Sequence, residues 1–367
     1  MAIAAFQGRP GTGKPFVTAI RAHFREREDA LMAWVARKPP IFALGAMICL
    51  AAAMPIEAAA EAPLVLERTI PLDNVSGRID HMAVDVAGKR LFVAELGNNS
   101  VDIVDLGAGK AAHRINGLKE PQGVGYVATQ DLIVVAGAGD GSVRFFRAGN
   151  LSPLGAIGLG DDADNVRIHP STGHVLVGYG SGGLAVIDAA SRSKIGDIRL
   201  LGHPESFQID RTTNRAFVNV PDAHQIAVVD LVSRRQVSAW KVPGLSANFP
   251  MALAGAAEPV AVVFRNPARL VLLGPATGAV MQRLDTCGDA DDVFFDGKRD
   301  RIYVSCGSGS VDVMARGAQG FQPAGRIPTS GGARTSLFVP ALDRLFVAAR
   351  AGLLGSRASI LVLRPVP

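Results

Sequence analysis

Side chains that could bind a ligand or take part in catalysis are concentrated in seven short segments of this 367-residue chain. The segments recur about every 42 residues. They are RIDH (78–81), EPQG (120–123), DDADN (161–165), HPES (203–206), ANFP (247–250), GDADD (288–292) and GART (332–335). Carboxylates outnumber basic side chains in them, and Asn and His lie between the carboxylates. This is the composition of a hard-cation site or of a pocket for a cationic ligand.

The surrounding sequence provides the elements that must bring these segments together. Each segment leads into a short apolar strand, a polar turn, a β-branched strand such as LFVAEL (91–96), a Gly, Asn or Asp turn, and a third strand such as SVDIVDL (100–106). A fourth, more polar strand closes most copies. Four strands at this period are typical of propeller blades. Seven copies are visible, and they begin at His81, Gln122, Asn165, Ser206, Met251, Asp292 and Thr335.

The two ends of the repeat predict how the ring of blades closes. The last copy contains three strands, and LVLERTI (64–70) precedes the first copy without a blade of its own. We therefore expect an all-β, seven-bladed β-propeller over residues 61–367, with 64–70 as the outer strand of the last blade. The alternatives are a β-sandwich, which would not repeat seven times at near-constant spacing, and a solenoid, which would need polar caps.

In a propeller, the innermost strand of every blade starts at the same rim of the central funnel, so the seven polar segments should converge there. The predicted oxygen ligands of a divalent cation such as Ca²⁺, or charge partners of a cationic group, are Asp164, Glu205, Asp289 and Asp291. The residues predicted to complete the ligand pocket are His81, Gln122, Asn165, His203 and Arg334. The alternative is that the Asp and Asn side chains only accept hydrogen bonds from the backbone of turns.

The first 60 residues predict export. Arg37 and Lys38 precede an apolar run at 41–56, and small residues follow it, which is the order of a signal peptide with cleavage after Ala60. Translation from Met32 would give a signal of ordinary length, so the start of the sequence is expected to be over-extended. The apolar run is shorter than the roughly 20 residues that span a bilayer, so no stable transmembrane anchor is expected. The predicted location is periplasmic or secreted.

Charge and motifs argue against two classes of partner. Residues 1–60 hold seven of the 38 Lys and Arg and four of the 33 Asp and Glu, which leaves 31 basic against 29 acidic residues. With no basic run, no nucleic acid is expected as a partner. GRPGTGK (8–14) is similar to a P-loop, but Pro15 replaces its Ser or Thr and no strand precedes it, so no nucleotide is expected. The expected partner is a small molecule or a periplasmic protein.

Removal of the signal peptide would leave two cysteines, Cys287 and Cys306, for which an oxidising compartment permits a disulfide. Centring the sixth hairpin on its GKRD turn places Cys306 opposite about Asp291. Cys287 then lies beyond direct pairing, so a disulfide requires the GDAD loop (288–291) to curl back.

Two stretches, LFVAELGNNSVDIVDL (91–106) and FVNVPDAHQIAVVDL (217–231), resemble the YVTN repeat of the YncE-like propellers. The resemblance covers residues 62–367, and GHPESF and GDADDVFFD are similar to segments of a secreted bacterial subgroup of that family. It implies a propeller fold and an extracytoplasmic location. It implies little about activity, because the fold includes both binding modules and enzymes.

Related propellers include haem proteins, quinone-dependent dehydrogenases and lactone hydrolases, and each of these activities requires residues that can be sought in the sequence. Haem attachment needs CxxCH, and the chain has no CxxC, so no haem is expected. Quinone-dependent dehydrogenases stack their cofactor on tryptophan, and Trp240 is the one tryptophan after residue 60. Lactone-hydrolysing propellers place carboxylates around a divalent metal at the funnel mouth. We predict a binding module acting through its acidic rim. A metal-assisted hydrolase of a lactone-like ester is the alternative, and a quinone- or metal-dependent oxidoreductase is the third possibility.

Overall fold

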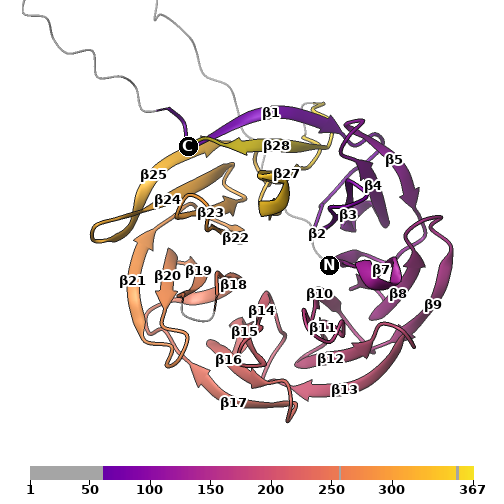
Figure 1. Cartoon of the computed structure of the whole chain (residues 1–367), viewed down its shortest axis with the longest axis horizontal. Helices are drawn as coiled ribbons and strands as arrows, with labels where there is room; N and C mark the ends of the chain where they lie inside the picture. Colours follow the sequence, from indigo (N-terminus) through magenta and orange to yellow (C-terminus); the bar gives the residue numbers. More distant parts are fainter. Residues whose placement is uncertain (1–60, 256–257, 353–354) are drawn as a thin grey trace, which may run out of the picture. The chain divides into compact units, whose positions relative to one another are not determined.

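The computed structural model describes residues 61–367 except 256–257 and 353–354. The predicted signal peptide, the Met32 start and the P-loop-like segment lie outside the described residues. The described part of the chain consists mainly of β-strands, which form seven four-stranded sheets arranged around a centre (Figure 1). The seven-bladed propeller expected from the repeat is confirmed. No helix among the described residues is long and apolar enough to span a lipid bilayer.

Each sheet has antiparallel strands in the same order, and we number the blades 1 to 7 from the sheet of β2 to the sheet of β26. The innermost strands are β2 (Met82–Asp85), β6 (Pro121–Val127), β10 (Ala163–Ile168), β14 (Phe207–Asp210), β18 (Ser246–Leu253), β22 (Ala290–Asp296) and β26 (Ser336–Val339). The second strands are β3 (Arg90–Glu95), β7 (Leu132–Gly137), β11 (Val175–Tyr179), β15 (Arg215–Val220), β19 (Val260–Asn266), β23 (Arg301–Cys306) and β27 (Arg344–Ala349). The third strands are β4 (Ser100–Asp105), β8 (Ser142–Arg147), β12 (Gly183–Asp188), β16 (Gln225–Asp230), β20 (Ala268–Leu273), β24 (Ser310–Gly317) and β28 (Ser359–Pro365). The outermost strands are β5 (Lys110–Ile115), β9 (Pro153–Gly158), β13 (Ser193–Arg199), β17 (Arg235–Trp240), β21 (Val280–Asp285), β25 (Gly320–Pro328) and β1 (Leu64–Pro71).

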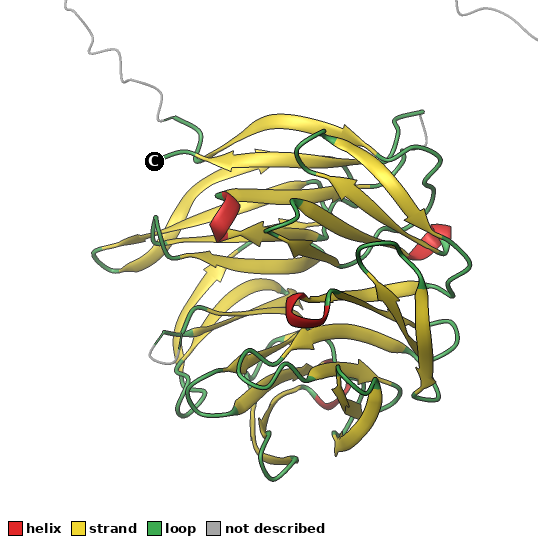
Figure 2. Cartoon of the chain, turned by 45° about the vertical axis from the view of Figure 1, so that its right-hand side comes forward, coloured by secondary structure: helices red, strands yellow, loops and turns green. Residues whose placement is uncertain are grey.

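One-turn 3₁₀ helices connect some of these strands (Figure 2). Those in the described residues are η1 (Leu96–Asn98), η2 (Ala128–Gln130), η3 (Pro221–Ala223) and η4 (Pro340–Leu342). Each is followed by a residue in the left-handed backbone region, and for η1 this is Asn99, with φ of 55°. Asn tolerates this conformation better than most residues, which explains its place in this predicted turn.

The core lies between the blades. The described residues contain seven buried apolar clusters, each shared by two neighbouring blades. In β3, for example, Leu91 and Val93 pack toward blade 7 whereas Phe92 and Ala94 pack toward blade 2. Side chains alternate between the two faces of a strand, so both faces of each blade are buried by its neighbours. Adjacent innermost strands contact each other around the whole ring, including β26 with β2.

The ring is closed by the first strand of the described chain. β1 pairs antiparallel with β28, with Leu64 opposite Pro365 and Pro71 opposite Ser359. Arg344 of β27 adds a contact across this sheet by donating a hydrogen bond to Glu67, at 2.7 Å. The prediction that 64–70 forms the outer strand of the last blade is confirmed.

Blade 6 contains a disulfide between Cys287 and Cys306, whose Cα atoms are 5.9 Å apart. Cys306 lies opposite Ala290, one residue from the predicted position, because β22 has a β-bulge between Ala290 and Asp292. Asp289 has a φ of 58°, and its carbonyl accepts a hydrogen bond from the Gly307 amide at 2.8 Å. The GDAD loop therefore curls back, as the disulfide requires.

β-Bulges also shift the predicted start of two blades. The residues at the level of His81 in blades 2 to 7 are Gly123, Asn165, Ser206, Pro250, Asp292 and Thr335. Gln122 and Met251, the predicted starts of blades 2 and 5, are each wrong by one residue. The cause is a bulge in β6 and another in β18. A one-residue shift turns a strand side chain to the opposite face of its sheet.

Candidate functional site

The rim at which the innermost strands begin, which we call the strand-start rim, brings together the polar segments of separate blades. His81 of blade 1 lies 3.9 Å from Asp164 of blade 3, and Arg334 of blade 7 lies 2.9 Å from Asp289 of blade 6. The rim residues form two groups. The histidine–aspartate group consists of Asp80, His81, Asp164, His203 and Glu205. The arginine–aspartate group consists of Arg265, Asp289, Asp291 and Arg334.

Asp164 is the centre of the histidine–aspartate group. Its Oδ1 atom lies 3.9 Å from Nε2 of His81, and its Oδ2 atom lies 3.8 Å from Nε2 of His203. The residue is 6% exposed, and its Oδ1 atom accepts no hydrogen bond from the described residues. Nδ1 of His203 donates to the carbonyl of Gly180 at 2.6 Å, which fixes the imidazole ring with Nε2 toward Asp164. The group thus holds a buried acceptor with spare capacity.

Burial and neighbouring charges shift protonation in this group. Burial lowers the pKa of His203, but its interaction with the Asp164 carboxylate and its hydrogen bond to the Gly180 carbonyl outweigh burial and raise that pKa to about 9. Burial also acts to raise the pKa of Asp164, but the two histidines outweigh it and the pKa is lowered. Burial and then the charge of Asp164 raise the pKa of Glu205 to about 8. Near neutral pH, we therefore expect a charged His203–Asp164 pair beside a protonated Glu205.

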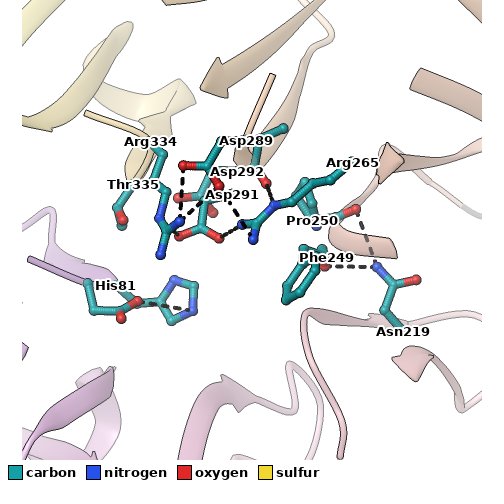
Figure 3. Close-up of polar contacts among 12 residues, drawn as sticks. His81, Asn219, Phe249, Pro250, Arg265, Asp289, Asp291, Asp292, Arg334 and Thr335 are labelled. Atoms are coloured by element: carbon teal, nitrogen blue, oxygen red, sulfur yellow. Dashed lines mark hydrogen bonds and ion pairs between the residues drawn. The ribbon is translucent and has the colours of Figure 1, made fainter. Parts of the chain in front are cut away.

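The arginine–aspartate group is held by reciprocal ion pairs (Figure 3). Arg265 contacts Asp291 through Nη2 and lies 3.5 Å from Asp289 through Nη1. Arg334 donates to Asp289 at 2.9 Å, and its Nε atom lies 3.1 Å from Asp291. The Arg265 guanidinium also lies over the ring of Phe249, 3.8 Å from its centroid. Two positive and two negative charges therefore balance each other across blades 5, 6 and 7.

The predicted oxygen ligands are divided between the two groups. Asp164 and Glu205 lie in one, whereas Asp289 and Asp291 lie in the other and are paired with arginines. Within the described ranges, no group of three or more His, Cys, Asp or Glu side chains is placed to hold a metal ion. Ca²⁺ takes about six to eight oxygen ligands, and these residues do not offer such a set around one point. The divalent-cation site stays a prediction, which metal analysis of the purified protein would test.

Two other predicted pocket residues lie beside the histidine–aspartate group. Gln122 donates to Asp162 at 3.3 Å, and Asp162 lies 3.6 Å from Nδ1 of His203. Asn165 is 1% exposed, and its Oδ1 atom has no hydrogen-bond partner among the described residues. Gln122 is therefore linked to the rim through Asp162, whereas Asn165 is a buried neighbour of Asp164.

Sequence reasoning missed Arg265 because it considered only the innermost strands. Arg265 belongs to β19, the second strand of blade 5. Antiparallel second strands run back toward the strand-start rim, so their last residues reach it as well. The signal in the sequence is an arginine at a strand end followed by Asn266 and Pro267.

A cavity of about 710 Å³ runs along the innermost strands and is lined by residues of all seven blades. Near the strand-start rim, its wall is polar and includes His81, Asp292 and Ser336. Farther along the strands, apolar side chains such as Phe295 and Phe338 contribute to the wall, and Asp296, Lys298 and Asp343 line its far end. We call this cavity the central channel. Its volume lies within the roughly 300–1,000 Å³ of small-molecule sites.

Comparison with known proteins identifies the fold. No family model and no curated protein matches the chain. Among solved structures, the chain is similar to hydrazine synthase of Kuenenia stuttgartiensis, with a TM-score of 0.65, 15% identity, and coverage of 84% of this chain and 98% of that one. It is also similar to the WD40 repeats of RRP9, with a TM-score of 0.68, 13% identity, and coverage of 83% and 99%. These likenesses show a seven-bladed β-propeller and nothing finer.

Proposed function

We propose that this chain is an extracytoplasmic, YncE-like binding module of the YVTN-repeat class, which holds a small molecule in its central channel. The observation that carries this proposal is the channel of about 710 Å³, which combines polar side chains at the strand-start rim with apolar side chains such as Phe294 and Phe338 farther along. An apolar pocket with a few convergent polar groups is the usual form of a small-molecule site.

The unequal pairing of the rim residues supports this role. The arginine–aspartate group has its charges matched internally, so it can hold three blades together without a ligand. Buried oxygens without a hydrogen-bond donor among the described residues occur in Asp164, Asn165 and Asp291. That of Asp291 lies 3.1 Å from the Arg334 guanidinium, whereas the Oδ1 atom of Asp164 has no partner closer than His81 at 3.9 Å. Buried polar atoms are normally hydrogen-bonded, so atoms of this kind mark positions where a ligand or water would complete the structure.

Two features support the proposed location. The sequence before residue 61 has the order of a signal peptide, and Cys287 is bonded to Cys306. Disulfides persist in oxidising compartments such as the periplasm.

A neutral fluorescent probe, N-phenyl-1-naphthylamine, tests whether the channel binds apolar molecules. Ala254 lines the channel beyond the end of β18, so Ala254→Trp should fill part of it. We expect wild type to bind one probe molecule and Ala254→Trp to bind it about tenfold more weakly or not at all. Ala108→Trp is the control, because Ala108 is an exposed turn residue that does not line the channel.

Equal probe binding by both variants would place the site outside the channel. An absence of probe binding by wild type, together with no retained small molecule in native mass spectrometry, would contradict the proposed function.

A further inference from the structure

One level of the channel wall contains a single charged side chain. Two residues beyond the level of His81, the seven blades contribute Ala83, Gly125, Arg167, Gln208, Ala252, Phe294 and Leu337 to the channel wall. Six of these residues carry no charge, and four are apolar side chains. Arg167 is therefore the one charged residue among the seven at this level of the channel.

Arg167 has few partners for its charge. It donates to the carbonyl of Val166 at 3.0 Å and to the hydroxyl of Ser206 at 3.4 Å, and it lies 5.6 Å from the ring centroid of Phe207. The residue is half-buried, and in the described part of the chain it forms no ion pair with Asp or Glu within 4.0 Å; the charges of Asp292 and Asp164 act on it from farther away. Buried charges are normally paired, and a guanidinium has five N–H donors, so Arg167 retains capacity for an anion.

Asp292 also lines the channel, and its charge acts on Arg167. It belongs to β22, which lies across the ring from β10 (Figure 1). Its Oδ2 atom accepts a hydrogen bond from the Ser336 amide at 2.7 Å. In the described part of the chain, Asp292 forms no ion pair with Arg167 within 4.0 Å, so it leaves the guanidinium free to bind a ligand.

We propose that the central channel binds an organic carboxylate with an apolar body, such as a medium-chain fatty acid, with the carboxylate on Arg167. This inference rests on the proposed function. The planar guanidinium matches a carboxylate with two parallel hydrogen bonds. Phe294 and Leu337 at the same level, and Ile168 and Phe338 farther along, provide apolar surface for the body of the ligand. A cationic head group would be repelled by Arg167.

Displacement of N-phenyl-1-naphthylamine by three molecules of equal chain length tests this specificity. Decanoate, decan-1-ol and decylammonium share the apolar body and differ in the charge of the head group. In wild type, we expect decanoate to bind about tenfold more tightly than decan-1-ol, equivalent to about 1.4 kcal/mol, and decylammonium to bind most weakly. Arg167→Gln should bring decanoate and decan-1-ol within about twofold of each other while the neutral probe still binds. Arg147→Gln, at an exposed residue of β8, is the control with the same change of charge and should retain the preference.

The outcomes separate this inference from the proposed function. If wild type binds decanoate and decan-1-ol equally, the channel binds small molecules but the carboxylate proposal is wrong. If wild type binds no probe and retains no small molecule in native mass spectrometry, the proposed function itself fails. If Arg167→Gln does not fold, Arg167→Lys is the variant to measure. It keeps the positive charge, so it should keep most of the preference for decanoate over decan-1-ol. Complete loss of that preference in a folded Arg167→Lys variant that still binds the probe would contradict a charge-based role.

Discussion

The two groups at the strand-start rim are built from similar side chains but differ in how completely their charges are matched. In the arginine–aspartate group, Asp291 contacts two arginines, and the neighbouring Cys287–Cys306 disulfide fixes the loop that carries it. In the histidine–aspartate group, Glu205 forms no ion pair with any described residue, and the carboxylate oxygens of Asp164 lie 3.9 Å and 3.8 Å from the imidazoles of His81 and His203. The comparison indicates that the ion pairing of the acids, rather than their number, distinguishes the two groups. We call the arginine–aspartate group the clamp, because it holds blades 5, 6 and 7 together, and we regard the histidine–aspartate group as the candidate binding surface.

Among the substitutions that test this comparison, removal of the disulfide should have the largest effect on the free energy of unfolding. The bond spans a sequence separation of 19 residues, and the loss of such a cross-link costs roughly 3 kcal/mol through the unfolded chain. We expect Cys287→Ser with Cys306→Ser to lower the free energy of unfolding by that amount, measured by urea denaturation. Reductant should destabilise wild type and leave the double variant unchanged. A wild type whose thiols are fully reduced without loss of stability would show that the clamp does not depend on the disulfide.

Asp291→Asn tests the ion pairs of the clamp directly. The substitution leaves Arg265 and Arg334 sharing Asp289, which is 45% exposed, so we expect a loss of about 2 kcal/mol in unfolding free energy. Asp285→Asn is the matched control, because Asp285 also pairs with an arginine, Arg269, but is 83% exposed. The control should change stability by less than about 0.5 kcal/mol. Equal effects of the two variants would remove the distinction drawn for Asp291.

Glu205→Gln should have the smallest effect, and one that depends on pH. The pKa of Glu205 is about 8 in the folded protein against an ordinary value of 4.5, so the folded state keeps a proton that the unfolded chain loses in this interval. Stability contributed by this group is therefore lost as pH rises toward 8. His203, with its pKa raised from 6.5 to about 9, acts in the same direction at higher pH.

We therefore expect the Tm of wild type to fall more steeply than that of Glu205→Gln between about pH 4.5 and pH 8, with little difference between the two proteins near pH 4.5. Glu258→Gln, at a 49% exposed residue, should follow wild type. Parallel Tm curves for all three proteins would show that Glu205 is ionised in the folded state at neutral pH.

The architecture was predictable because it follows from patterns that repeat in the sequence. Seven copies of one strand pattern specify the blades, and the unpaired strand at 64–70 specifies the closure. Register was less predictable, because a β-bulge adds a residue without changing the apolar pattern. The errors of one residue at Gln122, Met251 and the partner of Cys306 all fall next to bulges in β6, β18 and β22.

The candidate site was predictable in location but not in its pairing. The convergence of His81, Asp164 and His203 follows from the propeller topology. The pairing of Asp289 and Asp291 with Arg265 does not, because Arg265 comes from a different strand of a different blade. Arg167 was missed because it lies within an inner strand, where alternation predicts only wall residues.

The pairing of β1 with β28 also determines the order of assembly. Among the described residues, β1 is synthesised first and receives its partner only when β28 has been made, so the ring cannot be sealed before then. Until then, the edges of β1 and of blade 7 remain available for wrong pairing. A chain that stops before Ser359 would lack β28, so neither β1 nor β27 would have its partner there. Unfinished molecules therefore differ from complete ones in exposed strand edge, which makes them targets for proteolysis.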